Sequence, residues 1–312
     1  MDERWIHGLE SAPDAVRGGV LTIGNFDGVH VGHQRILRAA RALADSEGAD
    51  VVAMTFEPPP GALLHRGDPP QRISPPDRKA ARLREGGAHW VLVVETDAAL
   101  LRLSAGEFIE RIIVARLAPR YVVEGRNFYF GRGRAGNIDL LRSAGADAGF
   151  AVHVVDPVVV DLPEGPVRVS STGIRSLLAA GRIEDANRCL GRPFALYGRV
   201  VAGAGRGQAL GYPTVNLADC CQIVPADGVY AGRAALAGTE YAAAISIGTR
   251  CTFGAHDRAV EAFLLDADGT YYEQRVAFAF LQRLRGQVRF DGPQALKVQM
   301  AKDVQRVREI CG

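Results

Sequence analysis

The spacing of apolar residues along the 312-residue chain changes once, near Gly191, and this change limits the folds open to it. Before Gly191, short apolar runs typical of buried strands alternate with longer stretches of helical period. The expected strands are residues 20–23, 50–56, 90–94, 121–123 and 151–155. Alternation of strands and helices predicts a parallel sheet covered by helices, a doubly wound α/β domain of Rossmann-like type.

After Gly191 the runs become shorter and alternating or β-branched, and glycine-bearing turns separate them. These expected strands are residues 196–201, 229–236, 241–247, 260–265 and 274–281, with hairpin turns at 238–239 and 268–269. The pattern predicts an all-β antiparallel barrel or sandwich, of which we favour the barrel, followed by an amphipathic terminal helix from Pro293 to about Ile310. We therefore expect two domains, residues 1–188 and 189–312.

Charge and cysteine content restrict the function classes. A formal net charge of +2 gives no reason to expect nucleic acid or an anionic membrane as partner. No apolar run approaches the roughly 18 residues of a membrane span, and the N-terminus lacks the apolar stretch of a signal peptide. Five cysteines without a CxxC spacing suit a reducing compartment rather than a disulfide framework. We expect a cytoplasmic protein.

The segment GNFDGVHVGH, residues 24–33, follows the first expected strand and opens a helix. In a doubly wound sheet this crevice binds ligands, and the exposed amides of a helix N-terminus favour phosphate. His30 and His33 are three residues apart and so project from one face of the first helical turn. Two imidazoles there can donate hydrogen bonds to phosphoryl oxygens during group transfer. A metal site is the alternative, but no cysteine or carboxylate cluster completes it.

The glycines of this segment, Gly24, Gly28 and Gly32, remove Cβ atoms where a nucleotide approaches the backbone. A second segment, VSSTGIR at 169–175, places hydroxyl groups before a helix and an arginine in its first turn. An arginine fork at that position can clamp the phosphates that leave as pyrophosphate. A plain helix cap explains the same hydroxyls equally well.

A third segment, VEGRNFYFGRGRAG at 123–136, combines aromatic, amide and basic side chains. Asn127 can hydrogen-bond a flavin or its phosphate, and Phe128 or Phe130 can stack against the flavin ring. Arg132 adds positive charge that a phosphate attracts. A basic surface turn between a strand and a helix is the alternative interpretation.

The glycine-rich segment GAGRGQALGYPTVN at 203–216 is not a Walker loop, since it lacks the GKS/T ending. Its backbone amides can still wrap phosphates, whereas a bare glycine loop is more often a surface hairpin. The Thr214 hydroxyl and the Asn216 carbonyl are oxygen ligands suited to Mg²⁺. Glu261 is the only charge before the closing Asp266 in the apolar stretch of 259–266, so it is either a general base toward a substrate hydroxyl or a solvent-facing residue.

Taken together, these segments resemble the bacterial bifunctional riboflavin kinase/FMN adenylyltransferase family, also called FAD synthetases. The likeness lies in FDGVH with HxGH, SSTxIR, GxxxGRxLGxPTxN and VExxLLD, and runs from about Leu21 to Ile310. It implies an N-terminal module that transfers AMP from ATP to FMN and a C-terminal module that phosphorylates riboflavin. ATP, riboflavin and FMN are then substrates, with Mg²⁺ as cofactor, and a homo-oligomer is compatible with the sequence.

The resemblance also assigns roles to residues. It implies that Glu261, His30, His33 and Arg175 are catalytic and that Thr214 and Asn216 bind the metal. The flavin contacts are Asn127, Phe128, Phe130 and Arg132. The ATP contacts are Gly24, Phe26, Asp27, Gly28, Ser170, Ser171, Thr172, Gly203, Gly205, Arg206 and Gly211.

Three positions depart from the family pattern: Pro59 stands where a histidine is usual, Cys251 for proline and Phe263 for histidine. The first puts an ATP-side role of that position in doubt. Two rival interpretations remain. One is another adenylyltransferase or cytidylyltransferase with an unrelated β-domain, against which the PTxN segment and Glu261 argue. The other is a flavin-binding regulatory protein that has lost one or both activities.

Overall fold

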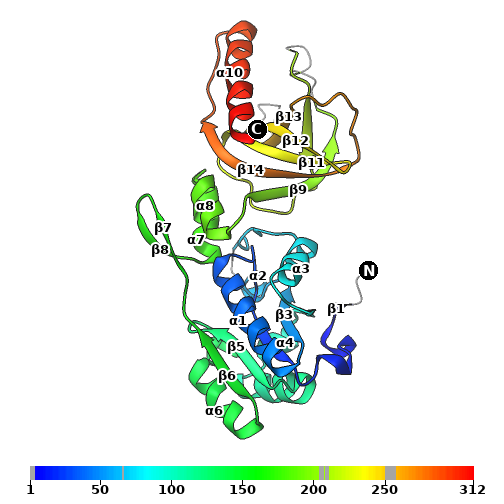
Figure 1. Cartoon of the computed structure of the whole chain (residues 1–312), viewed down its shortest axis with the longest axis vertical. Helices are drawn as coiled ribbons and strands as arrows, with labels where there is room; N and C mark the ends of the chain where they lie inside the picture. Colours follow the sequence, from blue (N-terminus) through cyan, green and yellow to red (C-terminus); the bar gives the residue numbers. More distant parts are fainter. Residues whose placement is uncertain (1–3, 65–66, 204–206, 208–210, 250–257) are drawn as a thin grey trace. The chain divides into compact units, whose positions relative to one another are not determined.

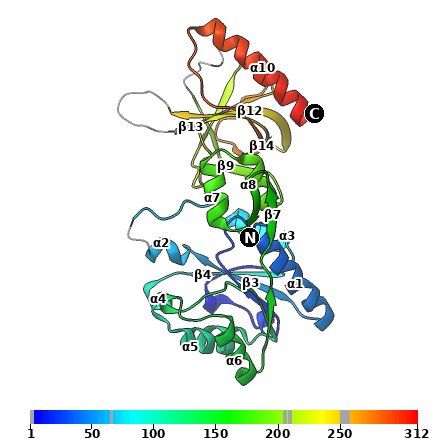
Figure 2. The same cartoon turned by 90° about the vertical axis from the view of Figure 1, so that its left-hand side faces the viewer.

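The computed structural model describes residues 4–64, 67–203, 207, 211–249 and 258–312. The chain divides into two compact units, whose elements can be followed in Figures 1 and 2. The first comprises Met1–Pro70 and Ser74–Ser170, and the second Gln71–Ile73 and Ser171–Gly312. The first unit thus ends earlier in the chain than the predicted domain boundary at 188–189, which stays a prediction about the two modules.

A parallel sheet forms the centre of the first unit. Its strands are β1 (Trp5–His7), β2 (Val20–Ile23), β3 (Val51–Glu57), β4 (Trp90–Glu95), β5 (Tyr121–Gly125) and β6 (Ala151–Val155). They lie in the order β1-β4-β3-β2-β5-β6, and every pair is parallel. The strand order reverses beside β2, which creates the crevice that doubly wound folds use for ligands. The edge strand β1, only three residues long, was not predicted.

Helices cover both faces of this sheet and divide the core in two. Leu37 of α1 (Val31–Glu47) and Leu83 of α3 (Pro76–Glu85) pack with Val51 on one face. On the other face, Phe108 of α5 (Ala105–Phe108) packs with Met54. Other elements of this unit are α2 (Pro60–Leu64), α4 (Ala98–Arg102), the π-helical η3 (Ile109–Leu117) and α6 (Ile138–Ala148), with the hairpin of β7 (Val159–Leu162) and β8 (Gly165–Arg168). The predicted doubly wound fold is confirmed.

The second unit holds a closed antiparallel barrel. Its described strands are β9 (Phe194–Val201), β10 (Thr214–Ala218), β11 (Gly228–Leu236), β12 (Thr239–Thr249), β13 (Arg258–Leu264) and β14 (Arg275–Arg285). They close in the order β10-β13-β12-β11-β14-β9, with β9 pairing again with β10. Two helices precede them, α7 (Ser171–Ala179) and α8 (Ile183–Leu190). The predicted barrel is confirmed, although β10 was interpreted only as a glycine-rich loop.

The turn between β11 and β12 lies one residue earlier than predicted. Ala237 has a φ of 53° and Gly238 a φ of 80°, while Thr239 is already the first residue of β12. Two successive residues of positive φ are typical of the turns whose twist matches a hairpin. Of the two turn residues, only Gly238 is a strong turn signal in the sequence, so the sequence did not indicate that Ala237 is the other.

The terminal helix α10 (Pro293–Cys311) lies against β11, β12 and β14 (Figure 1). Val307 is fully buried there, in a cluster with Ala231 and Leu265. Arg285 of β14 holds the helix through two hydrogen bonds to Asp303, of 3.1 Å from Nε and 2.7 Å from Nη2 to Oδ2. The side chain of Asp303 is 9% exposed and that of Arg285 19%, so removing one partner strands the other charge away from water.

We expect Asp303→Ala to destabilise the packing of α10 on the barrel by about 2–4 kcal/mol, because Arg285 is left with an uncompensated, mostly buried charge. Hydrogen exchange of the β14 and α10 amides, measured by mass spectrometry, should report the loss as faster exchange. The control is Glu309→Ala, which breaks the exposed pair with Arg306 and should cost less than about 0.5 kcal/mol. Equal effects of the two substitutions would contradict the role given to Asp303.

Candidate active sites

The two histidines of the first unit lie together at the start of α1. His30 is the N-cap residue of the helix, and its Nδ1 accepts a hydrogen bond of 3.3 Å from the His33 amide. The rings are stacked, with centroids 3.6 Å apart and planes 16° apart. The spacing of three residues therefore brings both imidazoles to one place beside the helix N-terminus, as predicted.

The glycines around these histidines make room for the rings of this chain. A Cβ on Gly24 would lie 3.2 Å from the ring of Phe26, and one on Gly32 would lie 3.1 Å from the ring of His30. The prediction that these glycines admit a nucleotide to the backbone misses this internal packing, which a local pattern does not show. Gly28 has a φ of 82°, a conformation that glycine adopts without strain.

Neighbouring elements fix the loop between β2 and α1. The Thr55 hydroxyl of β3 donates to the carbonyl of Asn25 at 3.2 Å, and the Ser74 amide donates to Oδ1 of Asp27 at 3.1 Å. Phe26 is buried, with its ring edge against His33. Phe26 and Asp27, both predicted to contact ATP, thus support the loop from within, and direct contact with ATP stays a prediction.

His33 is held in the uncharged state. Burial lowers the pKa of the imidazole well below its usual value, and the nearby His30 and Lys79 lower it further. Its Nδ1 atom is buried and has no hydrogen-bond partner in the structure. A neutral imidazole still carries one N–H donor, so His33 can offer a hydrogen bond at neutral pH without bringing in a second charge.

A buried carboxyl that sequence analysis missed lies under the same loop. Glu124, at the end of β5, is 3% exposed. Its Oε1 accepts hydrogen bonds from the Ile23 amide at 2.5 Å and from the Thr22 hydroxyl at 3.4 Å. Burial raises its pKa well above the usual value, and these hydrogen bonds oppose the rise. The available signal was a lone acid in the apolar run of 121–125.

The predicted phosphate clamp is divided: Ser170 is the last residue of the first unit, whereas Ser171, Thr172 and Arg175 belong to the second. Helix α7 begins at Ser171, so Ser171 and Thr172 are helical and only Ser170 precedes the helix. Arg175 is therefore the fifth helical residue, slightly beyond the predicted first turn, and its Nε donates to the carbonyl of Gln71 at 2.7 Å. Its pairing with the two histidines around one ATP stays a prediction.

The predicted flavin-side segment is divided between the core and the surface. Phe130 is buried, its centroid 5.6 Å from that of Phe108, and it stacks on the half-buried Phe128 at 5.2 Å. Asn127 and Arg132 are exposed. The polar residues are thus the accessible ones, while Phe130 has a packing role that its sequence position did not reveal. The flavin contacts of all four stay predictions.

In the barrel, register places the predicted kinase residues side by side. Asn216 of β10 pairs with Glu261 of β13, and Ser246 of β12 pairs with Glu261 from the other side. Thr214, two residues before Asn216, shares its face of the strand. Asn216 is 3% exposed and Glu261 is half-buried. Two motifs distant in sequence therefore form one polar cluster.

Gly203, the first residue of the glycine-rich segment, lies against the same cluster. A Cβ on Gly203 would lie 2.1 Å from Nδ2 of Asn216, so only glycine leaves room for this amide. Gly211 has a φ of 85°, another conformation that favours glycine. The predicted ATP contacts Gly205 and Arg206 lie outside the described residues.

The donor set around Asn216 fits a hard cation. Its amide, the Thr214 hydroxyl and the Glu261 carboxylate supply oxygen atoms, which Mg²⁺ prefers, and the ion usually retains waters and substrate phosphates in its remaining positions. The described residues contain no group of three or more histidine, cysteine, aspartate or glutamate side chains able to hold a metal alone. A cation here would therefore depend on phosphate oxygens as well.

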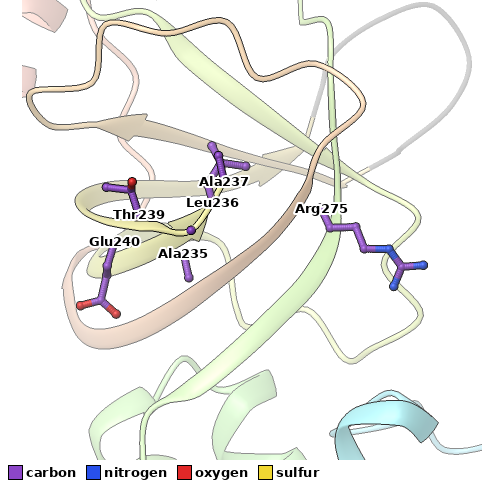
Figure 3. Close-up of a pocket in the computed structure, with 7 residues that line it drawn as sticks. Ala235, Leu236, Ala237, Thr239, Glu240 and Arg275 are labelled. Atoms are coloured by element: carbon purple, nitrogen blue, oxygen red, sulfur yellow. The ribbon is translucent and has the colours of Figure 1, made fainter. Parts of the chain in front are cut away.

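A pocket of about 330 Å³ opens elsewhere on the barrel, at the hairpin between β11 and β12 (Figure 3). It is lined by Ala235, Leu236, Ala237, Gly238, Thr239, Glu240 and Arg275. None of these residues belongs to the predicted sites. Figure 3 shows the Arg275 side chain directed away from the hairpin.

Known proteins match both units. The FAD synthetase family model matches residues 12–173 and the riboflavin kinase model residues 190–311. A bifunctional riboflavin kinase/FMN adenylyltransferase of Pseudomonas fluorescens is 37% identical over 306 residues, covering 98% of this chain and 97% of the relative. The protein of that name in Escherichia coli (strain K12) is 36% identical, covering 99% and 97%.

One solved structure extends the likeness to the fold of the whole chain. It is described as a macrolide-efflux protein from Streptococcus pneumoniae and has a TM-score of 0.88 at 27% identity, covering 98% of this chain and 99% of that one. Within the residues described for this chain, no helix is long and apolar enough to cross a membrane.

A nucleotidyltransferase-type sheet and a riboflavin-kinase-type barrel in one chain define a two-module enzyme of flavin cofactor synthesis. The chain belongs to the family of bifunctional riboflavin kinases/FMN adenylyltransferases. Enzymes of this family act on small-molecule substrates with ATP and generally need a divalent metal.

Glu124→Gln should remove a pH dependence from the stability of the first unit. Because the pKa of Glu124 is raised on folding, the folded state binds its proton more tightly, and wild-type stability falls as pH rises above the unfolded pKa of about 4.3. Glutamine keeps the carbonyl acceptor and does not titrate, so the variant should gain stability relative to wild type with rising pH.

The measurement is urea unfolding followed by tryptophan fluorescence at several pH values, since Trp5 and Trp90, the two tryptophans of the chain, both lie in the first unit. Glu110→Gln, at an exposed position, is the control and should leave the slope unchanged. A parallel pH dependence in wild type and Glu124→Gln would show that the prediction is wrong.

Gly203→Ala should lower riboflavin phosphorylation by about tenfold or more, because the added Cβ displaces the Asn216 amide and small misplacements are costly in group transfer. FAD formation from added FMN is the internal reference and should not change. Gly286→Ala, where an added Cβ meets only an arginine nitrogen at 3.9 Å, is the matched control. Full kinase activity in Gly203→Ala would refute the close approach.

Proposed function

We propose that this chain converts riboflavin to FMN in residues 189–312 and FMN to FAD in residues 1–188, with the residue roles given below. The proposal is carried by one observation: each unit contains its own cluster of polar groups suited to phosphate chemistry. These are the stacked His30 and His33 in the first unit and the paired Asn216 and Glu261 in the barrel. Each cluster matches one of the two reactions.

In the barrel, Glu261 is the general base for phosphorylation. Its carboxylate accepts the proton of riboflavin's ribityl hydroxyl while that oxygen bonds to the γ-phosphorus of ATP, and the bond from this phosphorus to the ADP oxygen breaks. Strand register places Glu261 between Asn216 and Ser246, and its half-buried position limits its contact with bulk water.

Mg²⁺ is the divalent metal we assign to the barrel, and Thr214 and Asn216 would hold it. When bound, the ion neutralises charge on the ATP phosphates. Because Gly203 has no Cβ, its backbone can lie close to the Asn216 amide, the group that would hold the metal.

In residues 1–188, a phosphate oxygen of FMN bonds to the α-phosphorus of a second ATP, and the bond to the pyrophosphate oxygen breaks. This step transfers no proton to the enzyme. The histidines therefore act as hydrogen-bond donors to phosphoryl oxygens rather than as bases. Arg175 binds the leaving pyrophosphate, together with the hydroxyls of Ser170, Ser171 and Thr172. Asn127 and Arg132 contact the flavin substrate.

We also propose that the protein works in the cytoplasm. Four of its cysteines lie in the described part of the chain, and all four are free, as expected in a reducing compartment. No step of either reaction uses a thiol.

Two substitutions should separate the reactions. Glu261→Gln should abolish FMN formation from riboflavin and spare FAD formation from added FMN, whereas His33→Ala should have the opposite effect. Purified variants are incubated with ATP, Mg²⁺ and either flavin, and the products are separated by chromatography. We expect losses of at least about 100-fold, typical for a lost base or transition-state donor.

The matched controls remove the same types of side chain at exposed positions outside the proposed sites. Glu240→Gln removes an exposed carboxylate of the barrel, and His153→Ala removes an exposed imidazole of β6. Both should retain both activities. Absence of FMN and FAD with the wild-type chain would refute the proposal, and loss of both activities in Glu261→Gln would refute the division between two sites.

A further inference from the structure

Lys79 is a buried cation that none of the sequence motifs contains. It lies on α3 with 4% of its surface exposed. Its Nζ donates to the Thr55 hydroxyl at 3.0 Å and to the Phe56 carbonyl at 3.3 Å, and lies 4.0 Å from Oε2 of Glu57. An ammonium costs free energy to bury even when paired, so its location calls for a physical reason.

The contacts of Lys79 lead into the adenylyl-transfer loop. Thr55, which accepts from Lys79, is itself fully buried and donates to the carbonyl of Asn25. Asn25 is the second residue of the segment that ends in His33. One hydroxyl thus links the ammonium on α3 with the backbone just after β2, and both of its hydrogen-bonding functions are used.

The charge of Lys79 also acts on the histidine pair. Together with burial and His30, it lowers the pKa of His33. The titratable groups that lower the pKa of His33 are thus His30 and Lys79. Glu57 of β3 lies 4.0 Å from Lys79. A positive charge on Lys79 disfavours a second positive charge on His33.

We propose that Lys79 is a positioning residue for adenylyl transfer: it holds the Asn25 end of the loop through Thr55, the residue that links α3 to the segment carrying the stacked histidines. The proposal rests on the assignment of His30 and His33 to that reaction.

Lys79→Met removes the charge and retains most of the side-chain volume. We expect kcat for FAD formation from FMN to fall on the order of 10- to 100-fold, as for other small losses of alignment. The acid limb of the pH profile should move to higher pH, because without the cation His33 binds its proton more readily. Titration of ¹³C-labelled histidine by NMR should show the same rise in the His33 pKa.

Arg78→Met is the matched control, since it removes a cation from the adjacent, exposed position of the same helix. It should leave kcat, the pH profile and the His33 titration as in wild type. Riboflavin phosphorylation by the barrel is an internal reference in both variants and should not change. Lys79→Met with wild-type kcat and an unmoved acid limb would overturn the proposal.

Two further variants test the proposal if Lys79→Met does not fold. Thr55→Val breaks the link to Asn25 and leaves the cation, so kcat should fall while the His33 titration stays as in wild type. Lys79→Arg retains the charge, so it should also keep the His33 titration. Wild-type kcat in Thr55→Val, or a raised His33 pKa in Lys79→Arg, would refute the proposal.

Failure of this inference is distinguishable from failure of the proposed function. If His33→Ala forms FAD normally, the histidine assignment is wrong and the Lys79 argument falls with it. If His33→Ala loses FAD formation while Lys79→Met keeps it with an unchanged pH profile, the adenylyl-transfer site stands and only the role of Lys79 is refuted.

Discussion

The polar groups buried at the carboxyl end of the parallel sheet are the constraint on which the first unit depends. There Glu124 accepts the Ile23 amide, Thr55 donates to Asn25 and Asp27 accepts the Ser74 amide. A buried polar group without a partner costs about 1–3 kcal/mol, so each contact fixes one point of the loop that joins β2 to α1. The loop is thereby held from β3, β5 and the segment before α3, which explains how an irregular stretch keeps two imidazole rings stacked at the start of a helix.

In the barrel, strand register holds the polar groups of the site in place. Asn216 and Glu261 are neighbours because β10 pairs with β13, and one fixed ladder sets their separation. In a barrel a slip of one residue would turn every side chain to the other surface, so the apolar core that fixes the register also fixes the polar pair. The first unit thus positions its site by side-chain contacts to a loop, whereas the second positions its site by the ladder itself.

Sequence patterns predicted the architecture because it follows from local periodicity. Apolar runs such as 20–23 that alternate with helical stretches predicted the parallel sheet. The change of pattern near Gly191 predicted the barrel that follows it. Strand β10 was missed because Gly211 and Pro213 precede it and are strong turn signals, although proline is tolerated just ahead of a strand. The family resemblance gave Asn216 and Glu261 roles in one reaction, but only the structure shows that they pair, since register between distant strands leaves no local signal.

Lys79 and Glu124 were missed for a different reason, and it bears on how such sites evolve. A single charge in a helix or strand usually faces water, so neither residue stands out in a sequence. Their importance arises from burial, which strengthens electrostatic interactions and makes every neighbouring charge matter. In this chain burial lowers the pKa of His33, and His30 and Lys79 lower it further, so the two stacked rings can lie together without both being charged.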